Sequence, residues 1–95
     1  APLATAQREL VEECGYTARE WRHLATLHPC VGYADERMEL FLARGLIHVG
    51  RQLDEGEFLD VVPMTLAEVR RGVREGRITD VKVVAALAWF GGLDR

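Results

Sequence analysis

The acidic segment at residues 8–16 constrains this chain most, because it places three carboxylates within five residues and then reaches a glycine. Side chains three and four residues apart share one face of a helix, so Glu9, Glu12 and Glu13 project together. Arg8, four residues before Glu12, offsets part of their repulsion. A divalent cation offsets more, because Mg²⁺ binds oxygen ligands and is commonly held by one or two carboxylates plus substrate phosphates. From the residues alone, a metal-binding helix face and a solvated acidic face both remain open.

The acidic segment belongs to an expected helix that begins at Pro2 and ends before Gly15. Proline suits the first helical turn, where its missing N–H has no partner in any case. Glycine is the usual residue just past a helix end. Apolar residues recur at three- and four-residue spacing opposite the carboxylates, at Leu3, Ala6, Leu10 and Cys14.

Glycine and proline divide the rest of the chain into short elements, with no internal repeat and no interdomain linker. A capping box, Thr65-x-x-Glu68, opens a helix that runs to about Glu75. Asp80 caps a final helix that ends at residues 91–92. The remaining expected elements are a short lead-in and a strand within residues 17–28, a loop at 29–32, a strand at 38–43, a loop at 45–57 and a strand at 58–62.

Composition limits the partners of the chain. It has 95 residues, a net charge of −3 and 48% hydrophobic residues, which is ordinary for a globular protein. A net negative charge does not favour binding to nucleic acid or to an anionic membrane. The longest apolar run, residues 83–90, is too short to span a bilayer. Cys14 and Cys30 lack CxxC spacing, so a reduced, cytoplasmic setting is the default expectation.

The acidic segment resembles the second half of the Nudix box, the signature G-x5-E-x7-R-E-U-x-E-E-x-G-U in which U is a bulky apolar residue. The matching residues are Arg8, Glu9, Leu10, Glu12, Glu13, Gly15 and, as the final U, Tyr16. The signature's first glutamate would fall one residue before Ala1, and its glycine six residues earlier still. The chain is therefore expected to begin inside the signature, as the C-terminal portion of a Nudix hydrolase.

Downstream segments resemble the ADP-ribose pyrophosphatase branch of this family. Residues 32–37 are similar to its Gly-aromatic-x-(Asp/Ser)-Glu-(Arg/Lys) segment, although Cys30-Val31 stands where the branch usually has Ser-Pro. Residues 54–62 and 78–87 resemble its Asp-Glu-x-Glu-Phe segment and its closing helix. The implied fold is α/β, the C-terminal part of a Nudix α/β/α sandwich with a mixed β-sheet. Residues 1–95 are then a single partial domain without its N-terminal strands.

The activity that this resemblance implies is Mg²⁺-dependent hydrolysis of the pyrophosphate bond in a nucleoside diphosphate linked to another moiety, X. The leading substrate is ADP-ribose, which gives AMP and ribose 5-phosphate. Carried over by position, Glu9 and Glu13 are the main ligands of Mg²⁺, with Mn²⁺ as an alternative ion. Glu12 is an additional or water-mediated ligand. Arg8 orients a carboxylate of the box through a charge-assisted hydrogen bond.

Glu36 matches the loop glutamate that is the usual candidate general base in this branch. In that role it activates the attacking water or helps to hold a metal. Asp35 and Glu39 are less favoured substitutes. An Asp–Glu pair at a loop-to-strand junction is also compatible with simple solvation.

Other functions remain as alternatives. They are a nucleotide-sugar pyrophosphatase acting on a substrate such as GDP-mannose, a non-catalytic Nudix-like nucleotide sensor, and an acidic α/β interaction domain. A sensor has no need for the four glutamates at positions 9, 12, 13 and 36. The implied partners are a small nucleoside diphosphate derivative and, in the full-length protein, a second copy in a homodimer, with no nucleic acid and no membrane. The fragment alone is expected to be inactive, because it lacks the first glutamate of the signature and half of the sheet.

Overall fold

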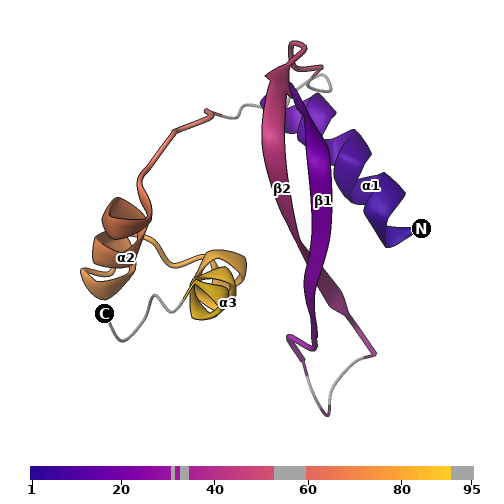
Figure 1. The fold of residues 1–95 in the computed structure, drawn as a ribbon. Coiled ribbons are helices and arrows are strands. Elements are labelled where there is room, and N and C mark those ends of the chain that lie inside the picture. The colour runs from indigo at the N-terminus through magenta and orange to yellow at the C-terminus, as the bar shows by residue number, and fades with distance from the viewer. Residues whose placement is uncertain (31, 33–34, 53–59, 91–95) are drawn as a thin grey trace. The chain divides into compact units, whose positions relative to one another are not determined.

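The computed structural model describes residues 1–30, 32, 35–52 and 60–90 of the chain. Its elements are the α-helix α1 (Pro2–Glu9), the π-helical turn η1 (Leu10–Cys14), the strands β1 (Tyr16–Leu27) and β2 (Met38–His48), and the helices α2 (Leu66–Arg74) and α3 (Val81–Trp89) (Figure 1). These elements confirm the predicted α/β class. Contacts divide the chain into two compact units, Ala1–Val61 and Val62–Arg95.

The N-terminal helix runs from Pro2 to Cys14, as predicted, but its last turn is wider than an α-helical turn. The N–H of Gly15 is shared between the carbonyls of Leu10 and Val11, at 3.0 Å from each. Gly15 has a φ of 80°, the left-handed conformation that commonly ends a helix. Turns of the π type are rare and occur frequently at functional sites. Here the change of helix type falls inside the acidic segment.

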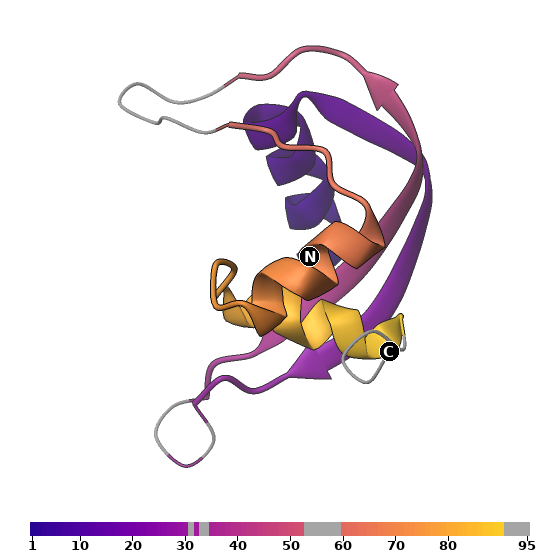
Figure 2. The same ribbon diagram turned by 90° about the vertical axis from the view of Figure 1, so that its left-hand side faces the viewer.

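Strands β1 and β2 form a long antiparallel pair and run side by side in both views (Figures 1 and 2). The register extends from Tyr16 opposite His48 to Leu27 opposite Met38. It shifts once, at Leu24, where β1 carries one extra residue in a β-bulge. In the described part of the chain, this pair is the whole sheet.

Both strands are longer than the sequence predicts. The expected lead-in before the first strand is wrong, because β1 is extended from Tyr16 onward. The expected loop is wrong for residues 45–48, which complete β2. In both places the hydrogen bonds to the neighbouring strand determine the conformation, and they override weak local periodicity and the glycine at position 45.

Helix α1 lies beside the part of β2 that carries Phe41. The ring of Phe41 meets Trp21 and His23 of β1 edge-on, with centroid distances of 6.4 and 5.4 Å. The ring quadrupole favours such edge-to-face pairs over parallel stacking. This aromatic cluster fixes the two strands to each other next to the helix.

The second unit contains two helices with the N-terminal caps that the sequence predicts. The hydroxyl of Thr65 accepts the N–H of Glu68 at 3.1 Å, and the Glu68 carboxylate accepts the N–H of Thr65 at 3.0 Å. Asp80 accepts the N–H of Lys82 at 2.7 Å. Leu87 of α3 is buried, with 2% of its surface exposed. None of the helices in the described ranges is long and apolar enough to cross a membrane.

The predicted strand at residues 58–62 is wrong for residues 60–62, which are irregular. Strand formation requires ladder hydrogen bonds with a neighbour, and Pro63, directly after this segment, has no N–H to donate. The other parts of that prediction, residues 58–59, lie outside the described residues. So do residues 53–57 of the expected loop and the glycines expected to end the last helix.

Candidate active site

The predicted site residues of the acidic helix are all accessible to solvent. Arg8, Glu9 and Glu13 are exposed, and Glu12 is half-buried. Nε of Arg8 lies 3.7 Å from Oε1 of Glu12, one helical turn later. The two side chains are 65% and 41% exposed, so this ion pair contributes only about 0.3–0.5 kcal/mol to stability. The carboxylate of Glu12 thus stays in contact with solvent.

The wide turn of the helix changes how Glu9 and Glu13 are aligned. In an α-helix each residue is rotated by about 100° about the helix axis, so residues four apart are rotated by about 40° more than one full turn. A turn closed by i→i+5 hydrogen bonds holds more residues, so each residue advances by less. The wide turn begins at Leu10, directly after Glu9. Glu13 thus lies within the wide turn, and Glu9 directly precedes it.

Two carboxylates one helical turn apart suit a magnesium ion. Mg²⁺ takes oxygen ligands, keeps several waters and is usually held by one or two carboxylates plus substrate phosphates. Among the described residues, no three side chains of His, Cys, Asp or Glu gather as a ligand group. Glu9 and Glu13 would supply two carboxylates to such an ion, and the substrate phosphates would supply the rest.

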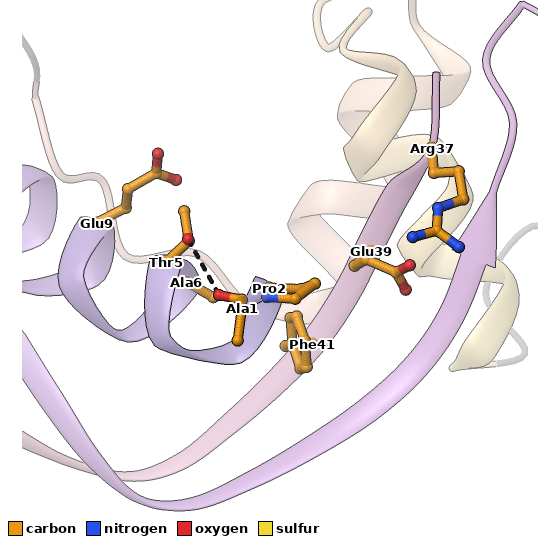
Figure 3. Close-up of a pocket in the computed structure, with 8 residues that line it drawn as sticks. All are labelled: Ala1, Pro2, Thr5, Ala6, Glu9, Arg37, Glu39 and Phe41. Atoms are coloured by element: carbon orange, nitrogen blue, oxygen red, sulfur yellow. Dashed lines mark hydrogen bonds between the residues drawn. The ribbon is translucent and has the colours of Figure 1, made fainter. Parts of the chain in front are cut away.

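A pocket of about 460 Å³ lies between α1 and the start of β2 (Figure 3). Its lining comes from two parts of the chain, Ala1, Pro2, Thr5, Ala6 and Glu9 on the helix side and Arg37, Glu39 and Phe41 on the strand side. The side chains of Arg37 and Glu39 point toward each other, on the side of the pocket away from Glu9. The pocket therefore brings a predicted metal ligand together with a second carboxylate and a cation.

Two side chains of β1 hold the carboxylate of Glu39. Its Oε2 accepts a hydrogen bond from Oγ1 of Thr26 at 2.7 Å and lies 2.6 Å from Nε2 of His23. The hydrogen bond from Thr26, followed by that from His23, lowers the pKa of Glu39 from its ordinary value, and the nearby charge of Arg37 acts in the same direction. Sequence reasoning names Glu39 only as a less favoured base, because its partners are 13 and 16 residues away along the chain.

The predicted base, Glu36, and its alternative Asp35 lie in the irregular segment just before β2. Both residues are exposed. Of the described residues in this part of the chain, Arg37 and Glu39 line the pocket and Glu36 does not. The structure thus places Glu9 and Glu39 in one pocket and leaves Glu36 outside its lining.

A short segment after β2, residues 49–52, which we call the strap, fastens the carboxyl end of the acidic helix. The carbonyl of Gly15 accepts the N–H of Val49 at 2.7 Å and the N–H of Gly50 at 3.1 Å. The carbonyl of Glu12 accepts the N–H of Gln52 at 3.0 Å. Sequence reasoning missed this contact and assigned the segment to a loop, because backbone hydrogen bonds leave no side-chain pattern. The one local signal in the sequence of the strap is Gly50, a residue typical of turns.

Comparison with known proteins shows which proteins this chain resembles. No family model matches the chain. The chain is 39% identical, over 94% of its length, to the methanol dehydrogenase activator of Bacillus methanolicus. It is 37% identical over 94% of its length to the ADP-ribose pyrophosphatase of Bacillus subtilis, and 36% identical over 90% to that of Mycobacterium tuberculosis. It spans 49%, 49% and 42% of these three relatives, in each case in their C-terminal part.

These relatives are of the Nudix type, so the resemblance that the acidic segment predicts is confirmed. The chain is related to the Nudix hydrolases over nearly all of its length. Two of the relatives to which it is similar are named ADP-ribose pyrophosphatase.

Proposed function

We propose that the whole protein hydrolyses the pyrophosphate bond of a nucleoside diphosphate linked to X in the presence of Mg²⁺, with ADP-ribose giving AMP and ribose 5-phosphate. The observation that carries this proposal is the pocket that joins Glu9 of the Nudix-box helix to Arg37 and Glu39. Its volume of about 460 Å³ is in the range of small-molecule sites. Two relatives named ADP-ribose pyrophosphatase favour this substrate.

The acidic helix would hold the metal through Glu9 and Glu13, with Glu12 as an additional or water-mediated ligand. When bound, a divalent metal polarises phosphoryl oxygens and lowers the pKa of a coordinated water. Mn²⁺ accepts the same oxygen ligands and is the alternative ion. The ion pair with Arg8 limits the orientations that Glu12 can adopt.

The strand side of the pocket would receive the phosphates and the attacking water. Arg37 carries a permanent positive charge, and its planar guanidinium matches the geometry of phosphate oxygens. Glu36 is next to Arg37 in the chain but outside the pocket lining, and in this proposal it takes the proton of the attacking water. Glu39 suits that role less, because its lowered pKa makes it a weaker base and Thr26 and His23 already occupy its Oε2.

The first test is turnover by the full-length protein with ADP-ribose, GDP-mannose and other nucleoside diphosphate sugars, each with Mg²⁺ and with a chelator. Release of AMP from ADP-ribose only in the presence of metal supports the proposal. Preference for GDP-mannose would assign the protein to another nucleotide-sugar specificity. Saturable binding without turnover of any substrate would replace hydrolysis by a sensor function.

The relative from Bacillus methanolicus favours a second candidate, in which the protein activates a dehydrogenase. The test is the rate of methanol oxidation by a methanol dehydrogenase with and without the full-length protein. Activation that is lost together with turnover in a Glu13→Gln variant would tie this effect to hydrolysis. Activation that survives in this variant would indicate a binding role.

The proposal includes a homodimer and a cytoplasmic setting. Dimer formation by the full-length protein is measured by light scattering at several concentrations. Cys14 is half-buried and Cys30 is exposed, and both are free thiols, which suits a reducing compartment. Fractionation of the native host tests the compartment.

A further inference from the structure

We propose that the strap is a positioning element for the metal-binding carboxylates, and that Gly50 is the residue on which its geometry depends. This inference rests on the proposed function, because it concerns the metal ligands of the acidic helix. It assigns a role to a segment outside the Nudix box.

The strap satisfies backbone groups that the helix cannot satisfy by itself. The last four carbonyls of a helix lack intrahelical partners, and Glu12 belongs to this last turn. Its carbonyl accepts the N–H of Gln52 at 3.0 Å, while the carbonyl of Gly15 accepts two N–H groups of the strap, those of Val49 and Gly50. Protein donors therefore take the place of water at the end of the helix.

These bonds hold the backbone on both sides of Glu13. Glu12, one residue before it, and Gly15, two residues after it, are each tied to the strap. The direction in which the Glu13 side chain leaves the helix is set by this backbone. Glu12 and Glu13 lie in the wide turn, and the strap adds hydrogen bonds to this turn beyond those that the helix forms within itself.

The strap also lies directly against the helix end. A Cβ atom built on Gly15 would be 2.7 Å from the backbone nitrogen of Arg51 and 2.9 Å from the carbonyl carbon of Gly50. The absence of a side chain at Gly15 is what permits this approach. The strap follows β2 immediately, and His48, the last residue of β2, pairs with Tyr16 just after the helix. The sheet register therefore fixes where the strap meets the helix.

Gly50 gives the strap its turn. Its φ of 89° is in the region that residues with a Cβ rarely adopt, and a Cβ there would meet nothing within 4 Å. Gly50→Ala therefore perturbs the backbone angle without introducing a clash. A change in this angle moves the N–H of Gln52 away from the carbonyl of Glu12, and the restraint on Glu13 is lost.

The chain offers a matched control in Gly76, which follows α2 in the other unit. Its φ is 78°, and a Cβ there would also meet nothing within 4 Å. Alanine at either position thus introduces a similar backbone strain. Gly50 belongs to the segment that hydrogen-bonds the acidic helix, whereas the N–H of Gly76 bonds the carbonyl of Val73 in α2.

The experiment measures Mn²⁺ binding to the full-length protein and its variants by electron paramagnetic resonance, together with amide hydrogen exchange at Gln52. We expect Gly50→Ala to weaken Mn²⁺ binding by about tenfold or more, the loss typical of removing a group that supports a metal ligand. Exchange at Gln52 should become faster. Gly76→Ala should change Mn²⁺ binding by less than about twofold. Gly50→Asn should recover most of the affinity, because asparagine tolerates a positive φ better than alanine does.

Equal Mn²⁺ affinities for Gly50→Ala and Gly76→Ala, both folded by circular dichroism, would overturn the role of the strap and leave the proposed function intact. If Gly50→Ala does not fold, Gly50→Asn is used in its place. Weakened Mn²⁺ binding by Gly50→Asn, with amide exchange at Gln52 as slow as in the unaltered protein, would also overturn the role of the strap. Absence of Mn²⁺ binding by the unaltered protein would overturn the metal site itself. The turnover assay then shows whether hydrolysis fails as well.

Discussion

Across the β1–β2 pair, Nε2 of His23 lies 2.6 Å from Oε2 of Glu39. The hydroxyl of Thr26 donates to the same oxygen at 2.7 Å. The Glu39 side chain is only 18% exposed, and it lines the pocket that Glu9 lines from the helix side. The negative charge of Glu39 is therefore held in place by side chains from a different strand. The two carboxylates of the pocket therefore differ, because Glu39 is held by hydrogen bonds from β1 and Glu9 is exposed to solvent.

The stabilisation provided by Glu39 should depend on pH. Hydrogen bonds from Thr26 and His23 lower its folded-state pKa from the ordinary value of 4.5, so folding favours the ionised form. The resulting stability is complete above about pH 4.5 and is lost as the pH falls through the lowered pKa. Glu39→Gln should therefore be less stable than the unaltered protein at about pH 7, and the difference in stability should narrow as the pH falls below the ordinary pKa of 4.5. Urea unfolding of both proteins across this range makes the comparison, and a gap that does not change with pH would contradict it.

Gly15→Ala should destabilise the protein more than Gly76→Ala. Both glycines have a φ near 80°, and alanine in that conformation costs about 1–2 kcal/mol. At Gly15 the added Cβ also meets the backbone of the strap, whereas at Gly76 it enters open space. Crowding of this kind typically adds about 1–3 kcal/mol. The free energies of unfolding of the two variants measure the difference, and equal losses would show that the strap moves aside without cost.

The helices of this protein could be predicted because their signals are local. Thr65 and Glu68 satisfy each other's backbone three residues apart, and Gly15 ends the first helix by its own conformation. The lengths of the strands could not be predicted in the same way. The pairing of Tyr16 with His48 joins residues far apart in the sequence, and it extends both strands through segments with weak or contrary local signals.

The candidate site divides in the same manner. Arg8, Glu9, Glu12 and Glu13 lie on one helix, where their spacing and the resemblance to the Nudix box place them, and Arg8 forms an ion pair with Glu12 at 3.7 Å. The hydrogen bonds of Glu39 and the contacts of the strap depend on how β2 lies against β1 and the helix. The hydrophobic pattern of a single segment cannot predict contacts between different segments. The predicted roles of Glu36 and of the metal ligands stay predictions, which the kinetics of single-residue variants can test.

Glu13→Gln should abolish metal-dependent turnover while leaving the fold intact. Glutamine keeps the size of the side chain but provides no negative charge for the metal. Losing a ligand should reduce turnover by more than the roughly 10–100-fold typical of losing a group that only supports one. Glu12→Gln is the matched variant, and its loss should be smaller, because Glu12 is assigned an additional or water-mediated role.

Steady-state turnover of the full-length variants at several Mg²⁺ concentrations, with circular dichroism as the check on folding, measures both effects. High Mg²⁺ should restore part of the activity of Glu12→Gln but not that of Glu13→Gln. Near-normal activity of Glu13→Gln would remove this residue from the metal site.

Glu36→Gln and Glu39→Gln should affect different kinetic constants. If Glu36 is the general base, its loss lowers kcat by roughly 10²–10⁴-fold and changes KM little. Glu39 lines the pocket with its charge fixed by Thr26 and His23, so its loss should act mainly on KM. The pH dependence of kcat adds a second criterion, because removal of the base also removes the fall in rate on the acidic side. A large loss of kcat in Glu39→Gln, with a normal kcat in Glu36→Gln, would identify Glu39 as the general base. Because the pKa of Glu39 is lowered, the rate would then fall at a pH below the ordinary range of a glutamate.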